Sequence, residues 1–380
     1  MSTRRARLSR VLALAVVGLL AAACSSTGSS SAGDSGSAKT MVGFIMVGST
    51  SDYGYNQAVY TASQQLAKDI PSANVITADH VPENNAVTQT MQSMVNKGAK
   101  VIFASSYGYY AYAEKFAAAH PDVIVLHQGG FETGKFSPNF GTYWGQAYEP
   151  VSLGGMAAGG LTKTNKLGFV YAFPISQTIA NIDAFELGAR SVNPQAQTYL
   201  VNTSNWCDPL KQKEAAAALL SEGVDVLSQH QDCQTTVIQT AKAAGKYVVG
   251  YHYDAKSLDP SGWLTGSAWN WTPVYEAITK VALSGNFTGS KYNANWVGSF
   301  ADHDNPLTLA SFGSSVPPDL QSKITAARTA LKNPGASVFT GPITCQDGST
   351  LVAAGQTMTY DQINNISCLV KGVVGTLPKS

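Results

Sequence analysis

The feature that most constrains the fold of this 380-residue chain is an alternation of short apolar runs with helical stripes, which occurs twice. Short apolar runs predict strands buried on both faces, and apolar residues spaced three or four apart predict amphipathic helices. The first occurrence predicts strands over 42–47, 74–78, 101–105 and 123–127, with helices over 55–66, 87–95 and 110–119. The second predicts strands over 167–172, 199–201, 224–228 and 247–251, with helices over 179–190, 211–221 and 235–244. Such alternation indicates right-handed βαβ units, so the fold class is α/β with parallel sheets in two similar halves.

A glycine-rich segment with the sequence GGMAAGG, residues 154–160, lies between the two halves. It is not directly followed by Lys and then Ser or Thr, as a phosphate-binding loop would require. We therefore expect this segment to be a tightly packed helix.

The N-terminus has the organisation of an export signal. Four arginines precede an apolar run over 11–23, and Cys24 follows directly. This pattern is typical of a secretory signal peptide, and the run is too short for an ordinary transmembrane helix, which needs ~20 residues. A cysteine directly after Leu-Ala-Ala-Ala is similar to a bacterial lipobox, so residues 1–24 are predicted to be a signal peptide with lipid attached to Cys24. The alternative is a secreted protein without lipid. Both interpretations place the functional part of the protein outside the cytoplasm.

Residues 25–40 are rich in Ser and Gly and are predicted to form a flexible tether with a reach of ~20–25 Å. No second long apolar run follows, so we expect anchoring to the cell membrane by lipid alone.

Composition narrows the possible partners and chemistry. Charged residues make up 13% of the chain, against the usual ~25%. Four of the basic residues lie in the signal peptide, so the remainder is mildly acidic and has no basic stripe, which argues against nucleic acid. The motifs H-E-x-x-H, G-x-S-x-G and C-x-x-C are absent. We expect no metal site, no cofactor and no enzymatic activity, a surface nucleosidase or esterase being the rejected alternative.

Four cysteines remain after Cys24, and an even number in an exported chain indicates disulfides. Three pairings are possible. We favour Cys207–Cys233 with Cys345–Cys368, because each pair closes a loop of moderate length.

Several segments together resemble the basic membrane protein (BMP) family of ABC-transporter substrate-binding lipoproteins. Residues 51–57 (SDYGYNQ) resemble that family's D-x-G-F/W-N-x segment, and 118–123 (AAHPDV) resemble its A-x-x-Y-P-D-V. Residues 154–159 lie where the family has L-A-G-x-x-A, and 186–190 (ELGAR) match its F-x-x-G-A-R element. The segments 251–254 (YHYD) and 263–271 (WLTGSAWNW) are similar to a purine-binding-like branch.

The resemblance implies a two-lobe periplasmic-binding-protein type I fold. Each lobe would be a parallel sheet with helices on both faces, and the ligand would bind between the lobes. We expect lobe 1 over 41–163 with part of 270–305, lobe 2 over 164–269 with part of 305–340, and a C-terminal extension over 340–380. Within the C-terminal part, 319–331 is predicted to be helical, and the extension is predicted to be a hairpin pinned by Cys345–Cys368 that caps a lobe.

Ligands of open α/β sheets bind beyond the carboxyl ends of the strands. Applied to the predicted strands and to the segment that crosses back, this rule selects twelve candidate ligand contacts: Asp52, Tyr53, Tyr55, Asn56, Tyr107, Tyr109, Phe173, Trp206, Asp232, Asp254, Trp269 and Trp271. Aromatic rings can stack on a planar ligand, and Asn and Asp suit the donors and acceptors of a nucleobase edge. Lys and Arg, which an anionic ligand would favour, are absent from this set. We infer a flat, uncharged heterocycle.

Some of these candidates have structural alternatives. Asp52 can be a helix N-cap, Asp254 a turn residue, and Trp206 can pack on a disulfide. If the segment around Trp269 and Trp271 is extended, the two rings point to opposite faces and only one can meet the ligand.

The resemblance also implies a way to separate bases from nucleosides. Nucleoside-binding members hold ribose with a Lys after the sixth-strand turn, but residues 267–270 here are Ser-Ala-Trp-Asn. The sequence therefore favours a free purine base bound by a monomeric importer component that docks on ABC permease subunits. The alternatives are a nucleoside ligand or a sensor that signals to a membrane receptor.

Overall fold

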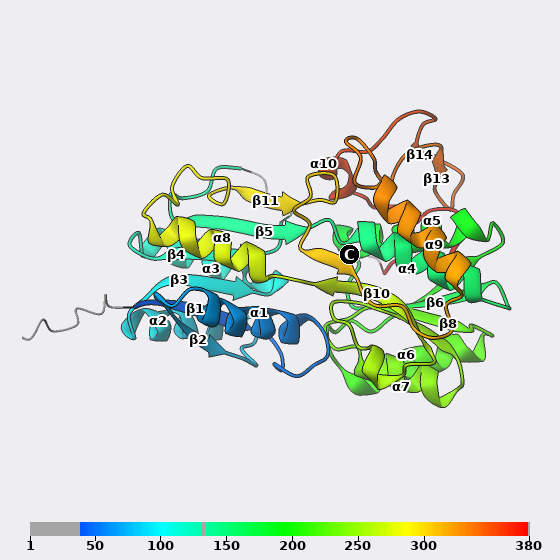
Figure 1. Ribbon diagram of the computed structural model, residues 1–380, viewed down its shortest axis with the longest axis horizontal. Helices are drawn as coiled ribbons and strands as arrows, with labels where there is room; N and C mark the ends of the chain where they lie inside the picture. Colours follow the sequence, from blue (N-terminus) through cyan, green and yellow to red (C-terminus); the bar gives the residue numbers. More distant parts are fainter. Residues whose placement is uncertain (1–38, 131–133, 379–380) are drawn as a thin grey trace, which may run out of the picture. The chain divides into compact units, whose positions relative to one another are not determined.

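Two sheets organise the chain in the computed structural model, which describes residues 39–130 and 134–378 (Figure 1). The predicted signal peptide, the lipidation site Cys24 and nearly all of the tether lie outside the described residues. None of the described helices combines the length and the apolar character needed to cross a bilayer.

The first sheet has six strands in the order β11-β5-β4-β3-β1-β2, all paired in parallel. Its strands are β1 (Thr40–Met46), β2 (Ala73–Ala78), β3 (Ala99–Ser105), β4 (Ile124–Gln128), β5 (Phe140–Gly145) and β11 (Asn295–Gly298). The helices that cover it are α1 (Tyr55–Asp69), α2 (Ala86–Asn96), α3 (Tyr110–Ala119) and α8 (Thr272–Leu283), with a short 3-10 turn η1 (Tyr107–Tyr109) before α3. We call this sheet with these helices lobe 1.

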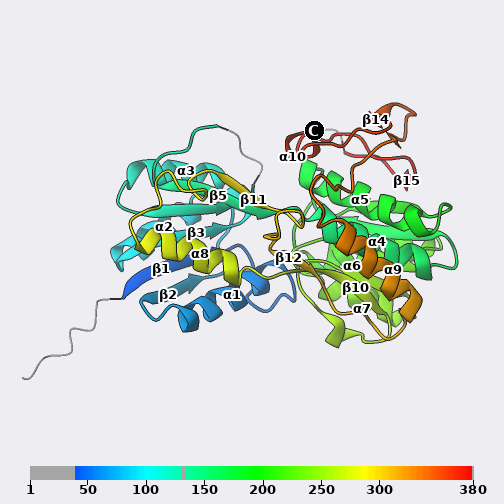
Figure 2. The ribbon, with the colours of Figure 1, turned by 45° about the horizontal axis from the view of Figure 1, so that its top comes forward.

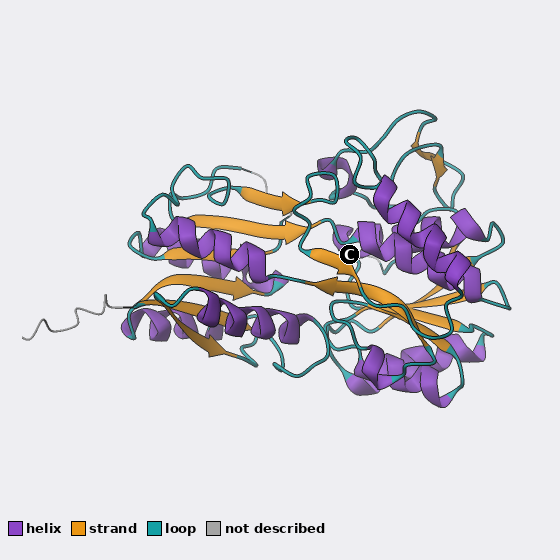
Figure 3. Ribbon diagram, in the orientation of Figure 1, coloured by secondary structure: helices purple, strands orange, loops and turns teal. Residues whose placement is uncertain are grey.

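The second sheet has seven strands in the order β12-β10-β9-β8-β6-β7-β15, of which only the β10–β12 pair is antiparallel. Its strands are β6 (Lys166–Tyr171), β7 (Gln197–Asn202), β8 (Val226–His230), β9 (Tyr247–Gly250), β10 (Trp263–Trp269), β12 (Leu307–Leu309) and β15 (Val373–Val374). The associated helices are α4 (Tyr148–Leu161), α5 (Ser176–Val192), α6 (Pro209–Ser221), α7 (Thr235–Ala243) and α9 (Pro318–Ala330), with the 3-10 turn η2 (Lys256–Leu258). This is lobe 2, which also carries the C-terminal segment 340–378 (Figure 3).

The predicted α/β fold class is confirmed, and every predicted strand and helix is present with ends that differ by a few residues. Strands β5, β10, β11, β12 and β15 were not predicted from the sequence. The chain passes between the sheets three times: after β5, after β10 and after β11.

The boundary between the lobes differs from the predicted one at helix α4. Residues up to 163 were expected in lobe 1, but α4 packs on α5, β9 and β10 of lobe 2. The predicted tight packing of its glycine-rich segment is confirmed, because a Cβ on Gly155 would lie 2.1 Å from the backbone oxygen of Phe185. On the facing helix, a Cβ on Gly188 would lie 1.9 Å from the backbone oxygen of Ser152. Only glycine, whose side chain is a hydrogen atom, allows α4 and α5 to come this close. Helix α4 is therefore packed tightly on lobe 2.

The C-terminal segment contains the short pair β13 (Ile343–Thr344) and β14 (Thr350–Val352), the one-turn helix α10 (Tyr360–Ile363) and β15. The predicted disulfide Cys345–Cys368 closes this segment, with 6.0 Å between the two Cα atoms. Strand β15 pairs with β7, so the chain's last strand covers an edge of the second sheet.

Candidate ligand-binding site

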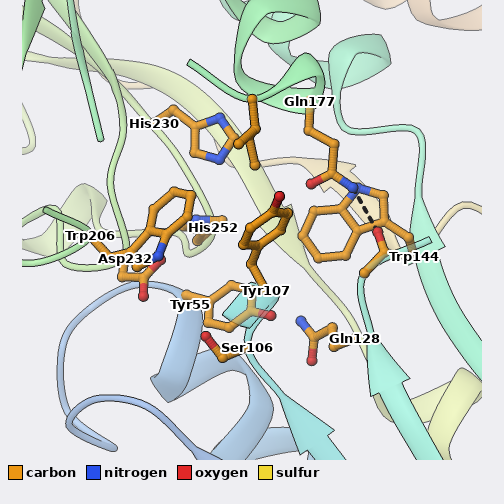
Figure 4. A pocket seen from close by; sticks show the side chains of 12 residues that line it. Tyr55, Ser106, Tyr107, Gln128, Trp144, Gln177, Trp206, His230, Asp232 and His252 are labelled. Atoms are coloured by element: carbon orange, nitrogen blue, oxygen red, sulfur yellow. Dashed lines mark hydrogen bonds between the residues drawn. The ribbon is translucent and has the colours of Figure 1, made fainter. Parts of the chain in front are cut away.

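A small cavity lies between the two lobes. Lobe 1 contributes Tyr55, Ser106, Tyr107, Gln128, Gly129 and Trp144 to its lining, and lobe 2 contributes Ile175, Gln177, Trp206, His230, Asp232 and His252. Figure 4 shows these side chains around a common space, with Trp206 and Trp144 on opposite sides of the view.

The strands and helices explain why these residues meet. Tyr55 is the first residue of α1, and Ser106 and Tyr107 directly follow β3. Gln128 is the last residue of β4, and Trp144 is the penultimate residue of β5. Because parallel strands end at the same edge of a sheet, these side chains gather at one edge, as Trp206, His230, Asp232 and His252 do in lobe 2.

Aromatic rings form much of the cavity wall. Trp206 contacts Phe173 at 4.9 Å between ring centroids and Tyr107 at 6.3 Å. Tyr55 contacts His252 at 5.1 Å and Trp144 at 6.4 Å. These rings present both faces and edges to the cavity, which suits stacking on a planar group.

Asp232 is the one carboxylate in the cavity lining. It is 7% exposed, and burial, followed by the nearby Asp52 and Glu83, raises its pKa well above the usual value. Among the described residues, no Lys or Arg lines this cavity. A buried carboxylate without a protein cation favours a ligand that donates a hydrogen bond to it.

Two histidines of lobe 2 are held neutral and present N–H groups. Burial lowers the pKa of His230 to about 3 and that of His252 well below its usual value. The Nε1–H of Trp269 donates to Nδ1 of His252 at 2.7 Å, which leaves the proton of the neutral ring on Nε2. That buried Nε2 has no hydrogen-bond partner among the described residues. His252, a residue of the cavity lining, therefore has an N–H donor without a partner among the described residues.

Gln128 provides a second unused donor. Its Oε1 accepts a hydrogen bond from the hydroxyl of Tyr143 at 3.1 Å, which orients the amide group. Its Nε2 is buried and has no partner within the described ranges. With Asp232 as acceptor and His252 and Gln128 as donors, the cavity matches a neutral ring that carries both kinds of group on its edge.

The structure brings four of the twelve predicted residues to this cavity, namely Tyr55, Tyr107, Trp206 and Asp232. A second, outer cavity adjoins it and shares Trp206 and Asp232. Asp52, Asn56 and Phe173 line the outer cavity.

Asp52 and Asn56 are mainly engaged within lobe 1. The Oδ1 of Asp52 accepts from the backbone N–H groups of Gly54 and Gln57, at 2.8 and 3.0 Å. Its Oδ2 accepts from the backbone N–H and the side-chain amide of Asn56, at 3.0 and 2.8 Å. Asp52 thus caps α1, which is the structural alternative that the sequence left open.

The five remaining predicted residues do not line either cavity. Tyr53 packs edge-on against Tyr253, the buried Tyr109 donates to the carbonyl of Val81, and Asp254 accepts the backbone N–H of Ser311 at 3.0 Å. Trp269 supports His252 from behind, and Trp271 is fully buried.

The condition for Trp269 and Trp271 to point to opposite faces, an extended segment, is not met. Strand β10 ends at Trp269 and the chain turns into α8, so the two rings stack 4.3 Å apart at 16°. The alternation of an extended strand does not apply across this turn.

Seven lining side chains were not among the predicted contacts: Ser106, Gln128, Trp144, Ile175, Gln177, His230 and His252. Four of them, Ser106, Ile175, His230 and His252, lie in the strand-end segments that the sequence rule selects. Trp144 was missed together with β5, whose aromatic residues are interrupted by glycines.

The two lobes also contact each other directly around the cavity. The backbone N–H of Tyr55 donates to the carbonyl of Asp232 at 2.9 Å, and the Gln234 side chain donates to the carbonyl of Tyr53 at 2.6 Å. On another side, Nε2 of Gln177 donates to the carbonyl of Gly129 at 2.6 Å (Figure 4). The structure is therefore a closed form.

The predicted disulfide Cys207–Cys233 is present, with 5.3 Å between the Cα atoms. Its two cysteines directly follow Trp206 and Asp232, and the backbone N–H of Asp232 donates to the carbonyl of Trp206 at 2.8 Å. The disulfide thus joins the two loops that carry these cavity residues.

The fold and this cleft agree with the comparison to known families. The sequence model of the family described as "ABC transporter substrate-binding protein PnrA-like" matches residues 39–297. The chain belongs to this Bmp family. Family members are the extracytoplasmic substrate-binding components of ABC transporters rather than enzymes.

Relatives differ in the ligand that their names give. A purine-binding protein of Brucella abortus is 29% identical over 342 residues, covering 90% of this chain and 95% of the relative. A Haloferax volcanii protein named as a candidate ABC transporter glucose-binding protein is 32% identical over 279 residues, covering 73% of this chain and 66% of the relative.

Two solved structures share the fold. A transcriptional activator of the comK gene from Bacillus halodurans superposes with a TM-score of 0.65 at 23% identity, covering 78% of this chain and 99% of that one. An ABC transporter solute-binding protein from Conexibacter woesei gives a TM-score of 0.62 at 20% identity, covering 77% and 96%. At these identities the likeness concerns the periplasmic-binding-protein type I fold alone.

Proposed function

We propose that this substrate-binding protein captures a neutral purine base, bound between the lobes, and delivers it to an ABC permease. The observation that carries the proposal is the edge chemistry of the inner cavity. Asp232 supplies an acceptor, while His252 and Gln128 supply donors without partners among the described residues. Purine bases carry ring N–H donors and ring or carbonyl acceptors in one plane.

The walls support the same ligand class. Tyr55, Tyr107, Trp144 and Trp206 offer aromatic surface from both lobes, and stacking on both faces of a flat ring buries apolar area. The absence of Lys and Arg among the described lining residues disfavours nucleotides, whose phosphates call for cations. The Brucella relative's name adds a purine precedent within the family.

We further propose that Cys24 carries the lipid that holds the protein, as a monomer, at the outer face of the cell membrane. The support is the sequence pattern of residues 1–24. Mass spectrometry of the membrane-extracted protein tests this, because a mature chain that begins at Cys24 with diacylglycerol is expected. A chain that begins after Cys24 would contradict it.

Isothermal titration tests the ligand. The protein is first stripped by unfolding and refolding, then titrated with adenine, guanine, hypoxanthine, xanthine, the corresponding nucleosides and glucose. We expect at least one base to bind with a Kd at or below about 1 μM, and its nucleoside to bind more weakly.

Tight binding of a nucleoside would contradict the preference for free bases. Tight binding of glucose alone would replace the purine proposal with the ligand named for the Haloferax relative. Measuring ATP hydrolysis by a permease encoded nearby distinguishes transport from sensing. If the protein serves transport, its ligand-loaded form is expected to stimulate this hydrolysis.

A further inference from the structure

The C-terminal segment is attached to lobe 2 but also contacts lobe 1. It lies beyond residue 297, where the family match ends. It is held on lobe 2 by β15 on β7 and by the backbone N–H of Val370, which donates to Oδ1 of Asp183 on α5 at 2.9 Å. Figure 2 shows the segment over α5, with α10 at its end nearest lobe 1.

Tyr360, the first residue of α10, makes the contact with lobe 1. Its hydroxyl donates to the carbonyl of Gly130, which follows β4. The same carbonyl accepts the Asn295 side chain of β11 at 3.3 Å, so it belongs to the framework of lobe 1. The bond thus links the two lobes next to the Gln177–Gly129 bond.

The start of α10 is itself fixed. The hydroxyl of Thr359 accepts the backbone N–H of Gln362 at 3.3 Å, and the Gln362 side chain accepts the backbone N–H of Thr359 at 2.8 Å. This reciprocal capping box defines where the helix begins. Tyr360 is therefore presented to lobe 1 from a rigid turn.

The contact lies beside the ligand site. A second small cavity shares Trp144 and Gln177 with the inner cavity. Tyr360, Ile363 and Asn364 also line this second cavity. Tyr360 therefore lies against a cavity whose lining includes two residues of the ligand site.

We propose that Tyr360 is a positioning residue that fastens lobe 2 to lobe 1 in the closed form and thereby slows ligand release. A bond between two lobes exists only while they are closed, so it stabilises the closed state relative to the open state. Because the bond holds the closed form, its loss speeds opening and with it ligand dissociation. The proposal rests on ligand binding between the lobes and does not depend on the ligand being a purine.

Amide hydrogen exchange tests the fastening without any ligand. The backbone N–H of Tyr55 donates to Asp232 across the lobes, so its exchange reports opening. We expect Tyr360→Phe, which removes only the hydroxyl, to raise this exchange rate about fivefold, the factor that one neutral hydrogen bond gives. The control is Gln346→Ala, whose side chain donates to the carbonyls of Val373 and Gly375 within the C-terminal segment. It is expected to leave the exchange of Tyr55 unchanged.

Ligand dissociation gives the second readout. Stopped-flow fluorescence with guanine and hypoxanthine as probes should show about fivefold faster dissociation for Tyr360→Phe. Thr359→Ala, which removes the cap of α10, should shift the same rate in the same direction but less. If neither probe binds the unsubstituted protein, the purine proposal fails and the exchange experiment alone decides the role of Tyr360.

The proposal is overturned if Tyr360→Phe melts as a folded protein yet shows the exchange of the unsubstituted protein at Tyr55. It is equally overturned if Gln346→Ala accelerates opening as much as Tyr360→Phe does, because the effect would then come from loosening the C-terminal segment. Should Tyr360→Phe fail to fold, the same two criteria apply to Thr359→Ala.

Discussion

Two loops that meet across the cleft carry an aspartate just before a helix, and the two aspartates differ in what they bind. In lobe 1, Asp52 precedes α1 and gives both oxygens to groups at the start of that helix. In lobe 2, Asp232 precedes α7, lines the inner cavity and makes no side-chain hydrogen bond at the start of that helix. The same residue type in the same position is a cap in one loop and a candidate ligand contact in the other.

The difference comes from what holds each loop. The loop before α7 is fixed by the disulfide of Cys233 and by Gln234, whose side chain donates to the carbonyls of Tyr53 and Tyr253. Because these groups order the loop, Asp232 is free to face the cavity. The loop before α1 has no disulfide, and the hydrogen bonds of Asp52 order it instead. A carboxylate is available to a ligand when other groups hold its loop.

The largest expected effect comes from preventing the two loops from meeting. A Cβ on Gly54 would lie 1.7 Å from the backbone oxygen of Asp232, and a backbone atom cannot rotate away. We expect Gly54→Val to disfavour closure and to weaken ligand binding at least about 100-fold, as when a competent state falls to about 1% of the population. Titration measures the affinity, and X-ray scattering measures the opening.

The control for Gly54→Val is Ser51→Val, which places the same side chain at an exposed position of the same loop. It should bind as the unsubstituted protein does. Normal affinity in Gly54→Val would show that binding does not need the two loops to touch.

The second-largest expected effect distinguishes the role of Asp232 from that of Asp52. Asp232→Asn keeps the shape of the side chain but cannot ionise, so a ligand N–H loses the carboxylate that it would stabilise on binding. We expect binding to weaken about 10- to 100-fold, the range for hydrogen bonds to charged groups. The same substitution should raise the melting temperature, since it removes a buried carboxylate whose pKa is raised by desolvation. Unchanged affinity would exclude Asp232 as a ligand contact.

The raised pKa of Asp232 also predicts a pH dependence. The folded state keeps the proton at pH values where the unfolded chain has lost it, so the free energy of unfolding falls as pH rises above the ordinary aspartate value of 3.8. Melting curves of the ligand-free protein from about pH 4 to about pH 8 should show a shallower fall for Asp232→Asn than for the unsubstituted protein. Parallel curves would contradict the assigned shift.

The smallest expected effect is that of Asp52→Asn on stability. Each oxygen of Asp52 accepts two donors, so whichever oxygen becomes an NH₂ group faces two N–H groups. We expect the free energy of unfolding to fall by about 1–2 kcal/mol, with a smaller loss of affinity than in Asp232→Asn. Denaturant unfolding measures it. A stability gain, as expected for Asp232→Asn, would mean that the two loops do not differ.

The sequence predicted the continuous parts of both sheets because their strands are uninterrupted apolar runs. Strand β1 contains Phe44, Ile45 and Met46, all fully buried. Strand β5 was missed because two glycines and Thr142 make up half of its six residues, which leaves no apolar run. Strands β11, β12 and β15 have two to four residues, and only pairing with distant segments makes them strands.

For the candidate site, the sequence could select loops but could not rank the residues within each loop. Asp52 and Asp232 are equivalent in sequence terms, and only the contacts of the folded chain distinguish them. The donor role of His252 depends on Trp269 binding its Nδ1, which is a tertiary contact. Gln128 is similar, because Tyr143 orients its amide.

The three passes of the chain between the sheets have a consequence for folding. Lobe 1 is completed only by β11, after most of lobe 2 has been synthesised, and lobe 2 is completed only by β15 near the C-terminus. Both sheets therefore need contacts between residues far apart in the sequence, whose loops are slow to close. We expect neither half to fold alone as it emerges, so that the body of the protein forms as one cooperative unit once the whole chain is available.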